Sequence, residues 1–309
     1  MPLISVVTPC YNEEGNIRSL CAQIREVFAK ISAYDYEHIV IDNASKDGTA
    51  DILRGLAKED KNLKVIINAR NFGHIRSPHY AFLQAKGDAV IVMASDLQDP
   101  PSLIPEFIKK WEEGYKIVLG IKSESEESPL MFFIRKRYYD LVSRLSEIEL
   151  VKNTTGFGLY DRVIVDTVRA IDDPYPYFRG MICDIGFEQA HIHYRQAKRR
   201  RGITKNNFYT LYDMAMLGIT NHSKVPLRLA TIFGFFMSVL GFFLAVGYLF
   251  AKLLFWNYFA LGFAPILIGF FLFSAVQLFF IGIIGEYIGA IHTQVLKRPL
   301  VVEKERINF

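Results

Sequence analysis

The sequence has few cysteines and little net charge. Cys10, Cys21 and Cys183 are the only cysteines in 309 residues, and their spacing matches neither a disulfide framework nor a metal site. The formal net charge is only +4, so no overall basic field indicates a nucleic-acid partner. We therefore expect a protein that faces a reducing compartment and binds no nucleic acid.

Two glycine-rich phosphate-binding motifs are also missing. The sequence contains neither a Walker-type glycine–lysine loop nor a Gly-x-Gly-x-x-Gly turn, which argues against P-loop and dinucleotide chemistry. The first residues, Met-Pro-Leu-Ile-Ser, lack a basic region and a cleavage site. We therefore expect no signal peptide.

Charge is absent from two long apolar runs in the last third of the chain. Residues 229–251 and 253–285 contain no charged side chain. About 20 apolar residues suffice for a helix to cross a bilayer. The pattern predicts a membrane hairpin over 226–290, with spans at about 229–251 and 263–285 and a tail over 291–309. A buried hairpin of a soluble protein is the alternative.

Basic residues flank this predicted hairpin on both sides. Arginines and lysines gather before the first run and after the second, whereas only Lys252 lies between the runs. The positive-inside rule then predicts that both termini are cytoplasmic, in the cell (inner) membrane. Residues 206–225 are amphipathic and predict a juxtamembrane helix in the membrane interface, with a core helix as the alternative.

The first 120 residues alternate short apolar runs with helical patterns. Apolar runs that predict strands occupy 4–8, 38–41, 64–67, 89–93 and 116–119, and helical periods occupy 16–30, 49–58 and 78–86. Strands that are nearly all apolar indicate a parallel sheet covered on both faces. We expect an α/β domain over 1–205 whose ligands bind at the carboxyl ends of its strands.

Polar residues gather where three of these strands end. The segments are 8–14, 42–49 and 95–101, and their strands should bring them to one edge of the sheet. A carboxylate at a strand end can accept hydrogen bonds from a base or ribose. Acidic groups near a diphosphate can hold Mg²⁺ or Mn²⁺, which prefer oxygen ligands.

These segments, with others downstream, resemble glycosyltransferase family 2. The resemblance is to its membrane-anchored polyprenyl-phosphate subgroup, which includes dolichol-phosphate mannose synthase-like and bactoprenol glucosyl transferase-like proteins. It covers nearly the whole chain and depends on the order of several short segments. They are 5–14 (SVVTPCYNEE), 41–49 (IDNASKDGT), 70–73 (RNFG), 85–88 (AKGD), 96–101 (DLQDPP), 155–162 (TGFGLYDR), 178–180 (FRG) and 201–205 (RGITK).

The resemblance implies a GT-A fold and inverting transfer of one sugar from a nucleotide-sugar, with UDP favoured. The implied acceptor is polyprenyl (undecaprenyl) phosphate at the cytoplasmic face of the bilayer. A Mg²⁺ or Mn²⁺ ion bound by Asp96 and Gln98 would hold the diphosphate. The remaining implied roles are nucleotide-sugar binding by Pro9, Tyr11, Glu13, Asp42, Asp96 and Gln98, and phosphate binding by Arg201 and Lys205.

The sequence departs from the family pattern at three positions. Ala94 stands where a first metal-binding aspartate is common, so Asp99 is a candidate to compensate. Asn43 replaces the second aspartate of the usual Asp-Asp-Gly-Ser, and Gly156 stands near a position that is often acidic. An acceptor phosphate is largely ionised at neutral pH, because its second pKa is about 6. It therefore needs little base; Asp184 is the candidate if a base exists, beside Asp96 as the other catalytic residue.

Two other functions stay open at this point. A processive polysaccharide synthase would carry a Gln-x-x-Arg-Trp segment, but neither Trp111 nor Trp256 follows an arginine. A non-catalytic membrane scaffold that retains the nucleotide-sugar fold is suggested by Ala94 and Gly156. The sequence does not decide between a monomer and a homo-oligomer.

Overall fold

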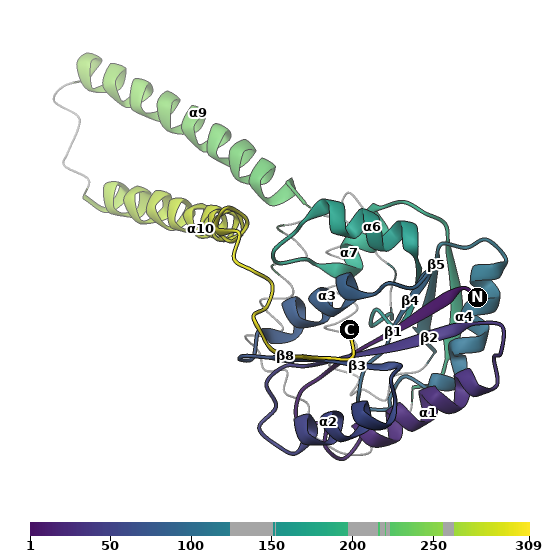
Figure 1. The fold of residues 1–309 in the computed structure, drawn as a ribbon. Helices are drawn as coiled ribbons and strands as arrows, with labels where there is room; N and C mark the ends of the chain where they lie inside the picture. Colours follow the sequence, from purple (N-terminus) through teal and green to yellow (C-terminus); the bar gives the residue numbers. More distant parts are fainter. Residues whose placement is uncertain (124–150, 152, 197–215, 217–219, 221–222, 256–262) are drawn as a thin grey trace.

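The computed structural model describes the chain except for residues 124–150, 152, 197–215, 217–219, 221–222 and 256–262. The described strands form one sheet of eight, in the order β7-β5-β6-β4-β1-β2-β3-β8. Helices cover both faces, and two long helices extend away from the domain (Figure 1). The fold is α/β with a mostly parallel sheet, as predicted.

The first half of the domain consists of repeated strand–helix units. These strands are buried along most of their length, and their buried side chains are apolar except for a few, such as Ser5, Glu37 and Asp42, that are polar. The elements are β1 (Leu3–Cys10), α1 (Ile17–Ala29), β2 (Asp35–Asp42), α2 (Thr49–Glu59), β3 (Leu63–Asn68), α3 (Gly73–Gln84) and β4 (Ala89–Val92).

One predicted helix begins earlier than expected. The sequence pattern started it at Pro78, because proline is favoured at the first helical position. In the structure α3 begins at Gly73, and Pro78 lies inside it. Proline has no N–H to donate to the carbonyl of the preceding turn, so this helix forgoes one backbone hydrogen bond. The strong local signal at Pro78 was therefore misleading.

The second half of the domain extends the sheet past β4. β6 runs antiparallel between β4 and β5, and β7 is parallel to β5. The elements are η1 (Pro101–Leu103), α4 (Ile104–Glu112), β5 (Ile117–Lys122), β6 (Gly158–Asp161), α6 (Arg162–Ile171), α7 (Phe178–Asp184) and β7 (Gln189–Tyr194). β6 and the edge strand β8 are reversed, whereas β7, β5, β4, β1, β2 and β3 all point the same way.

Among the described residues, three apolar clusters fill the two sides of the sheet. Alternate residues of β1 enter different clusters: Ile4 and Val6 pack with α1 and α4, whereas Val7 packs with α3, α6 and α7. Phe82 of α3 lies at the centre of the second cluster, edge-on to Tyr160 at 5.6 Å between ring centroids. The clusters hold the sheet rigidly between two helical layers.

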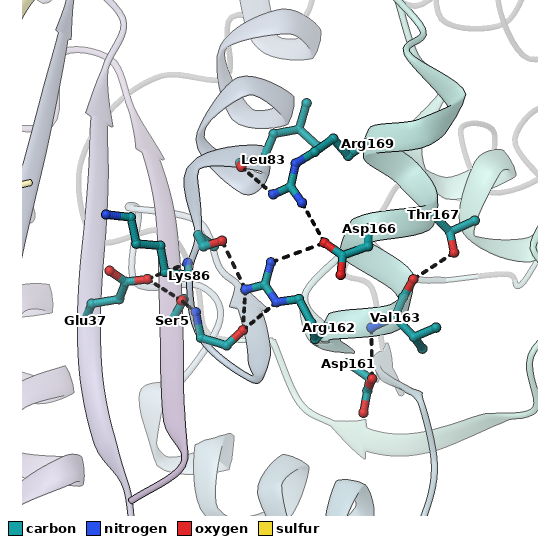
Figure 2. A network of polar contacts seen from close by, with 12 residues as sticks. Ser5, Glu37, Leu83, Lys86, Asp161, Arg162, Val163, Asp166, Thr167 and Arg169 are labelled. Carbon is teal, nitrogen blue, oxygen red and sulfur yellow. Dashed lines mark hydrogen bonds and ion pairs between the residues drawn. The ribbon is translucent and has the colours of Figure 1, made fainter.

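A polar network joins the two halves at the edge where β4 begins (Figure 2). The Arg162 guanidinium at the start of α6 donates to the carbonyls of Ala85 and Gly87. Glu37 of β2 accepts from Ser5 Oγ at 2.5 Å and from the backbone N–H of Lys86 at 2.8 Å. This partly buried network fixes the turn that leads into β4, and it lies at the end of the sheet opposite the three predicted site loops.

The last elements leave the domain and then return to it. α9 (Val225–Leu254) and α10 (Phe263–Leu296) are both long and apolar enough to cross a membrane, by length and composition. β8 (Glu303–Ile307) then pairs antiparallel with β3 as the edge strand of the sheet. Residues 303–307, assigned from sequence to a tail, are thus part of the domain.

Candidate active site at the carboxyl edge of the sheet

The three predicted site loops meet at one edge of the sheet. β1 lies between β4 and β2 and is parallel to both, with Cys10 opposite Asp42 and Val7 opposite Val92. The loops after β1, β2 and β4 therefore start side by side, as predicted. One strand separates Asp42 from the loop that carries Asp96.

Hydrogen bonds between backbone and side-chain groups join the loop after β1 to the loop after β2. The N–H of Asn12 donates to Ser45 Oγ at 2.8 Å, and the N–H of Lys46 donates to Asn12 Oδ1 at 2.8 Å. The N–H of Glu13 donates to Thr49 Oγ1 at 2.9 Å. Asn12 takes a positive φ of 56°, which asparagine tolerates better than most residues. The two loops therefore form one preorganised corner.

The side chains predicted to bind the nucleotide line this corner. Asp42 is fully buried; it accepts from the hydroxyl of Ser45 and from the Ser45 N–H at 3.1 Å. Burial raises the pKa of Asp42, although the bonds from Ser45 oppose the rise. Glu13 is buried and accepts from Asn16 Nδ2 at 2.6 Å. Pro9 lies near the end of β1 and Tyr11 in the loop that follows, and both are half-buried.

Asn43 connects the corner to the loop before α3. Its Oδ1 accepts from Asn68 Nδ2 at 3.1 Å and from the Phe72 N–H at 2.9 Å. Its Nδ2 donates to Asn71 Oδ1 and to the Gly73 carbonyl, both at 3.0 Å. All four hydrogen-bonding positions of the amide are thus used. Since a carboxylate cannot donate, the structure explains why asparagine stands where relatives often have aspartate.

The loop after β4 presents two oxygen-bearing side chains, Asp96 and Gln98. Both are half-buried, and the Gln98 N–H donates to Asp96 Oδ1 at 3.2 Å. Leu97, between them, takes a positive φ of 61° and packs against the core cluster of α1 and α4. Asp99, the next acid, is buried and bonded to Tyr194 at 2.6 Å. Burial raises the pKa of Asp99.

The donors of this loop fit a hard divalent cation only in part. Asp96 and Gln98 supply oxygen, the ligand type that Mg²⁺ and Mn²⁺ take. Position 94 is alanine, and the described residues contain no group of three histidine, cysteine, aspartate or glutamate side chains that could hold a metal. Mg²⁺ often uses one or two protein ligands and completes its shell with substrate phosphates and water. The side chains present fit that mode of binding.

Three predicted site residues do not join this group. Asp184 is the last residue of α7, exposed, and precedes β7, which begins at the opposite edge of the sheet. With Tyr287 and Gln294 of α10 it lines an open groove of about 400 Å³. Arg201 and Lys205 lie outside the described residues. The structure therefore brings the nucleotide and metal candidates together, but not the candidate base.

Two features of the site were missed by sequence reasoning. Gly156 has a φ of +89°, a conformation that side chains disfavour, which accounts for the absence of an acid there. Tyr194, at the end of β7, reaches the loop of Asp99 across 95 positions of sequence. No local pattern marks the backbone conformation of Gly156 or the contact between Tyr194 and Asp99, although the polar loop itself was a signal for Asp99.

Comparison with known proteins agrees with this geometry. A family model described as "Glycosyl transferase family 2" matches residues 5–169. The glycosyltransferase YkcC of Bacillus subtilis is 34% identical over 302 residues, which cover 96% of this chain and 92% of that protein. A bactoprenol glucosyl transferase of Shigella phage SfV is 32% identical, over 97% of this chain and 98% of its own.

Solved structures with a similar arrangement have lower sequence identity. Glucosyl-3-phosphoglycerate synthase from Mycobacterium tuberculosis in complex with UDP is 18% identical, with a TM-score of 0.45 over 71% of this chain and 78% of that one. The family match spans more than half of the 309 residues and includes the three loops at the carboxyl edge. The chain is a glycosyltransferase and belongs to glycosyl transferase family 2.

Proposed function

We propose that this glycosyltransferase moves a single sugar from a nucleotide-sugar to polyprenyl phosphate at the cytoplasmic face of a membrane. The observation that carries the proposal is the meeting of the Asp42 and Asp96 loops at the carboxyl edge of a sheet. The similarity to bactoprenol glucosyl transferases over nearly the full chain supports the acceptor class. A uridine nucleotide and undecaprenyl phosphate are the favoured substrates.

The proposed reaction needs little proton chemistry from the protein. An oxygen of the acceptor phosphate attacks the anomeric carbon of the sugar from the face opposite the diphosphate. A new carbon–oxygen bond forms, the bond to the diphosphate oxygen breaks, and the nucleoside diphosphate leaves with the electron pair. The acceptor phosphate is mostly ionised at neutral pH, so positioning and charge stabilisation supply most of the rate.

Each group of the site then has a role in binding. The joined loops of Pro9, Tyr11, Glu13 and Asp42 hold the nucleoside. When bound, a Mg²⁺ or Mn²⁺ ion on Asp96 and Gln98 would neutralise charge on the departing diphosphate. Arg201 and Lys205 contact the phosphates of donor or acceptor. Asp184 is not needed as a base, because the nucleophile is already an anion.

The proposed membrane attachment follows from the two long helices. Their apolar side chains are largely exposed over the candidate spans Val225–Leu244 and Leu272–Leu296, and exposed apolar surface of that extent indicates a lipid contact. β3 precedes both helices and β8 follows them in the same sheet. If both helices cross the bilayer, the connection between them lies on the far side. By the positive-inside rule, the basic flanks favour a cytoplasmic domain.

A donor panel with undecaprenyl phosphate tests the proposal. The purified full chain in detergent is incubated with UDP-, GDP- and dTDP-sugars, and the lipid product is weighed by mass spectrometry. We expect one sugar per lipid with one donor, and no nucleoside diphosphate release by Asp96→Ala. Asp166→Ala, an exposed residue of α6, serves as the matched control and should retain turnover. Absence of turnover with every donor would contradict the proposal.

Ala94 favours one alternative, a non-catalytic scaffold that retains donor binding. Such a protein would bind the nucleotide-sugar without metal and would release no nucleoside diphosphate. Calorimetry with and without Mn²⁺ separates the two functions. A product with several sugars per lipid would instead indicate a processive synthase.

A further inference from the structure

The loop that carries Asp96 and Gln98 is anchored at alternate residues. Leu97 packs into the apolar cluster between the sheet, α1 and α4, and Asp99 is only 3% exposed. Asp96 and Gln98 are half-buried, as is Leu97, but neither of these polar side chains belongs to the apolar cluster. Leu97 and Asp99, which alternate in sequence with Asp96 and Gln98, thus anchor the loop to the rest of the domain. Whatever fixes residues 97 and 99 also fixes the direction of the two proposed ligands.

Asp99 is held by a partner from the far end of the sheet. Its Oδ1 accepts from the hydroxyl of Tyr194 at 2.6 Å. A buried carboxylate that accepts such a bond is strongly fixed in place. The Asp99 carboxylate is therefore hydrogen-bonded within the protein.

Tyr194 is itself rigid. Its ring packs edge-on against Phe157 at 5.4 Å between centroids, and Phe157 packs in turn against Phe107 at 4.9 Å. Gly120 makes this approach possible, because a Cβ there would lie 2.8 Å from Phe157 Cδ1 and 3.1 Å from Tyr194 Cε1. The Tyr194 carbonyl accepts from both the N–H and the hydroxyl of Ser123. These contacts with core residues thus fix the position of the Tyr194 hydroxyl.

We infer that Asp99 and Tyr194 are positioning residues that set the geometry of Asp96 and Gln98 for the donor diphosphate and its cation. Asp99 does not act as a metal ligand in place of the carboxylate that is missing at position 94. It stabilises the conformation of the loop through its bond to Tyr194. This inference rests on the proposed function, because it requires that Asp96 and Gln98 hold the cation with the diphosphate. On this inference, the affinity for the cation depends on the long-range bond between Asp99 and Tyr194 and not on a further metal ligand.

The test measures Mn²⁺ binding to the full chain in detergent with saturating UDP, by electron paramagnetic resonance of the free ion. Tyr194→Phe removes only the hydroxyl, and we expect the Mn²⁺ dissociation constant to rise on the order of 10-fold, as for the loss of one bond to a charged group. The KM for the donor should rise with it, more than kcat falls.

Tyr34→Phe is the matched control. Tyr34 makes a bond of the same kind and length, 2.6 Å to Glu112 Oε1, but on the exposed surface. Its removal should leave the Mn²⁺ dissociation constant unchanged. Asp99→Asn keeps an oxygen that can accept from Tyr194, so it should weaken Mn²⁺ binding less than Asp96→Ala does. This second variant also tests the inference if Tyr194→Phe does not fold, as judged by its thermal transition.

The outcomes separate the inference from the proposed function. If the unmodified chain shows no UDP-dependent Mn²⁺ binding, the proposed function fails at this site. If it binds but Tyr194→Phe binds equally well, the positioning role is wrong. If Asp99→Asn abolishes binding as completely as Asp96→Ala, Asp99 is a direct ligand and the inference is overturned.

Discussion

Replacement of Asn43 by aspartate should destabilise the domain although the change is isosteric. The Asn43 amide donates to Asn71 Oδ1 and to the Gly73 carbonyl, both at 3.0 Å. A carboxylate loses both donated bonds and faces two acceptors in a site that is only 7% exposed for residue 43. With about 1–3 kcal/mol for each buried group left unsatisfied, we expect a loss of about 3 kcal/mol.

The thermal midpoint of the full chain in detergent measures this loss. For a domain of this size, about 1 kcal/mol corresponds to roughly 2–4 °C, so Asn43→Asp should unfold roughly 6–12 °C below the unmodified chain at pH 7.5. Protonation restores one donor to the carboxyl group. The deficit should therefore shrink as the pH falls toward 5, because the site disfavours the charged form.

Asn71→Asp supplies a control with the same chemical change in the same cluster. Asn71 Oδ1 only accepts, from Asn43 Nδ2 at 3.0 Å and from the Gly73 N–H at 2.7 Å. A carboxylate accepts both bonds equally well, so this variant should keep its thermal midpoint. Equal midpoints for the two variants, or a deficit for Asn43→Asp that does not depend on pH, would refute the reasoning.

Three further predictions concern the sheet edge, the buried histidines and the support of Tyr194. Removal of residues 301–309 uncovers β3, which pairs with β8; we expect faster hydrogen exchange in β3 and aggregation through the open edge, and unchanged exchange would contradict a structural role. Burial lowers the pKa of His38 to about 3 and that of His79 to about 4. Both pKa values lie below the unfolded value of about 6.5, so the folded state disfavours the protonated imidazoles. The free energy of unfolding is therefore unaffected by these groups above pH 6.5 and falls on acidification, by about 2 kcal/mol for each histidine at pH 5. His79→Leu should flatten the dependence of the thermal midpoint on pH between 7 and 5. Gly120→Ala places a Cβ 2.8 Å from Phe157 Cδ1 and should lower the midpoint, whereas Gly55→Ala, with no atom within 4 Å of its Cβ, should not.

The sequence alone determined much of the domain. Apolar runs such as 4–8 and 38–41 specify strands buried on both faces, because only a parallel sheet between helices hides them. The polar loops after those strands follow from the same pattern, and parallel neighbours bring the loops to one edge. Asp42 and Asp96 could therefore be placed together before any coordinates were known. The two long uncharged runs likewise predicted the helices α9 and α10.

The edge strand β8 could not be predicted from the sequence. Its residues, Glu-Lys-Glu-Arg-Ile, carry no apolar run, and charged side chains are common on edge strands because they face water. The strand forms because β3 offers an unpaired edge and because its side chains find partners there. Glu305 pairs with Arg54 at 2.8 Å, and Asn308 Nδ2 donates to the Ala57 carbonyl at 2.7 Å. Both partners lie more than 240 positions away.

The finer geometry of the site was decided by the tertiary structure for the same reason. Asn43 acquires its role from atoms of Asn68, Phe72 and Gly73, and Asp99 acquires its role from Tyr194. A sequence pattern reports which face of an element is apolar and where a chain turns. It does not report which buried donor meets which acceptor across the sheet, because those pairings depend on packing between elements distant in sequence.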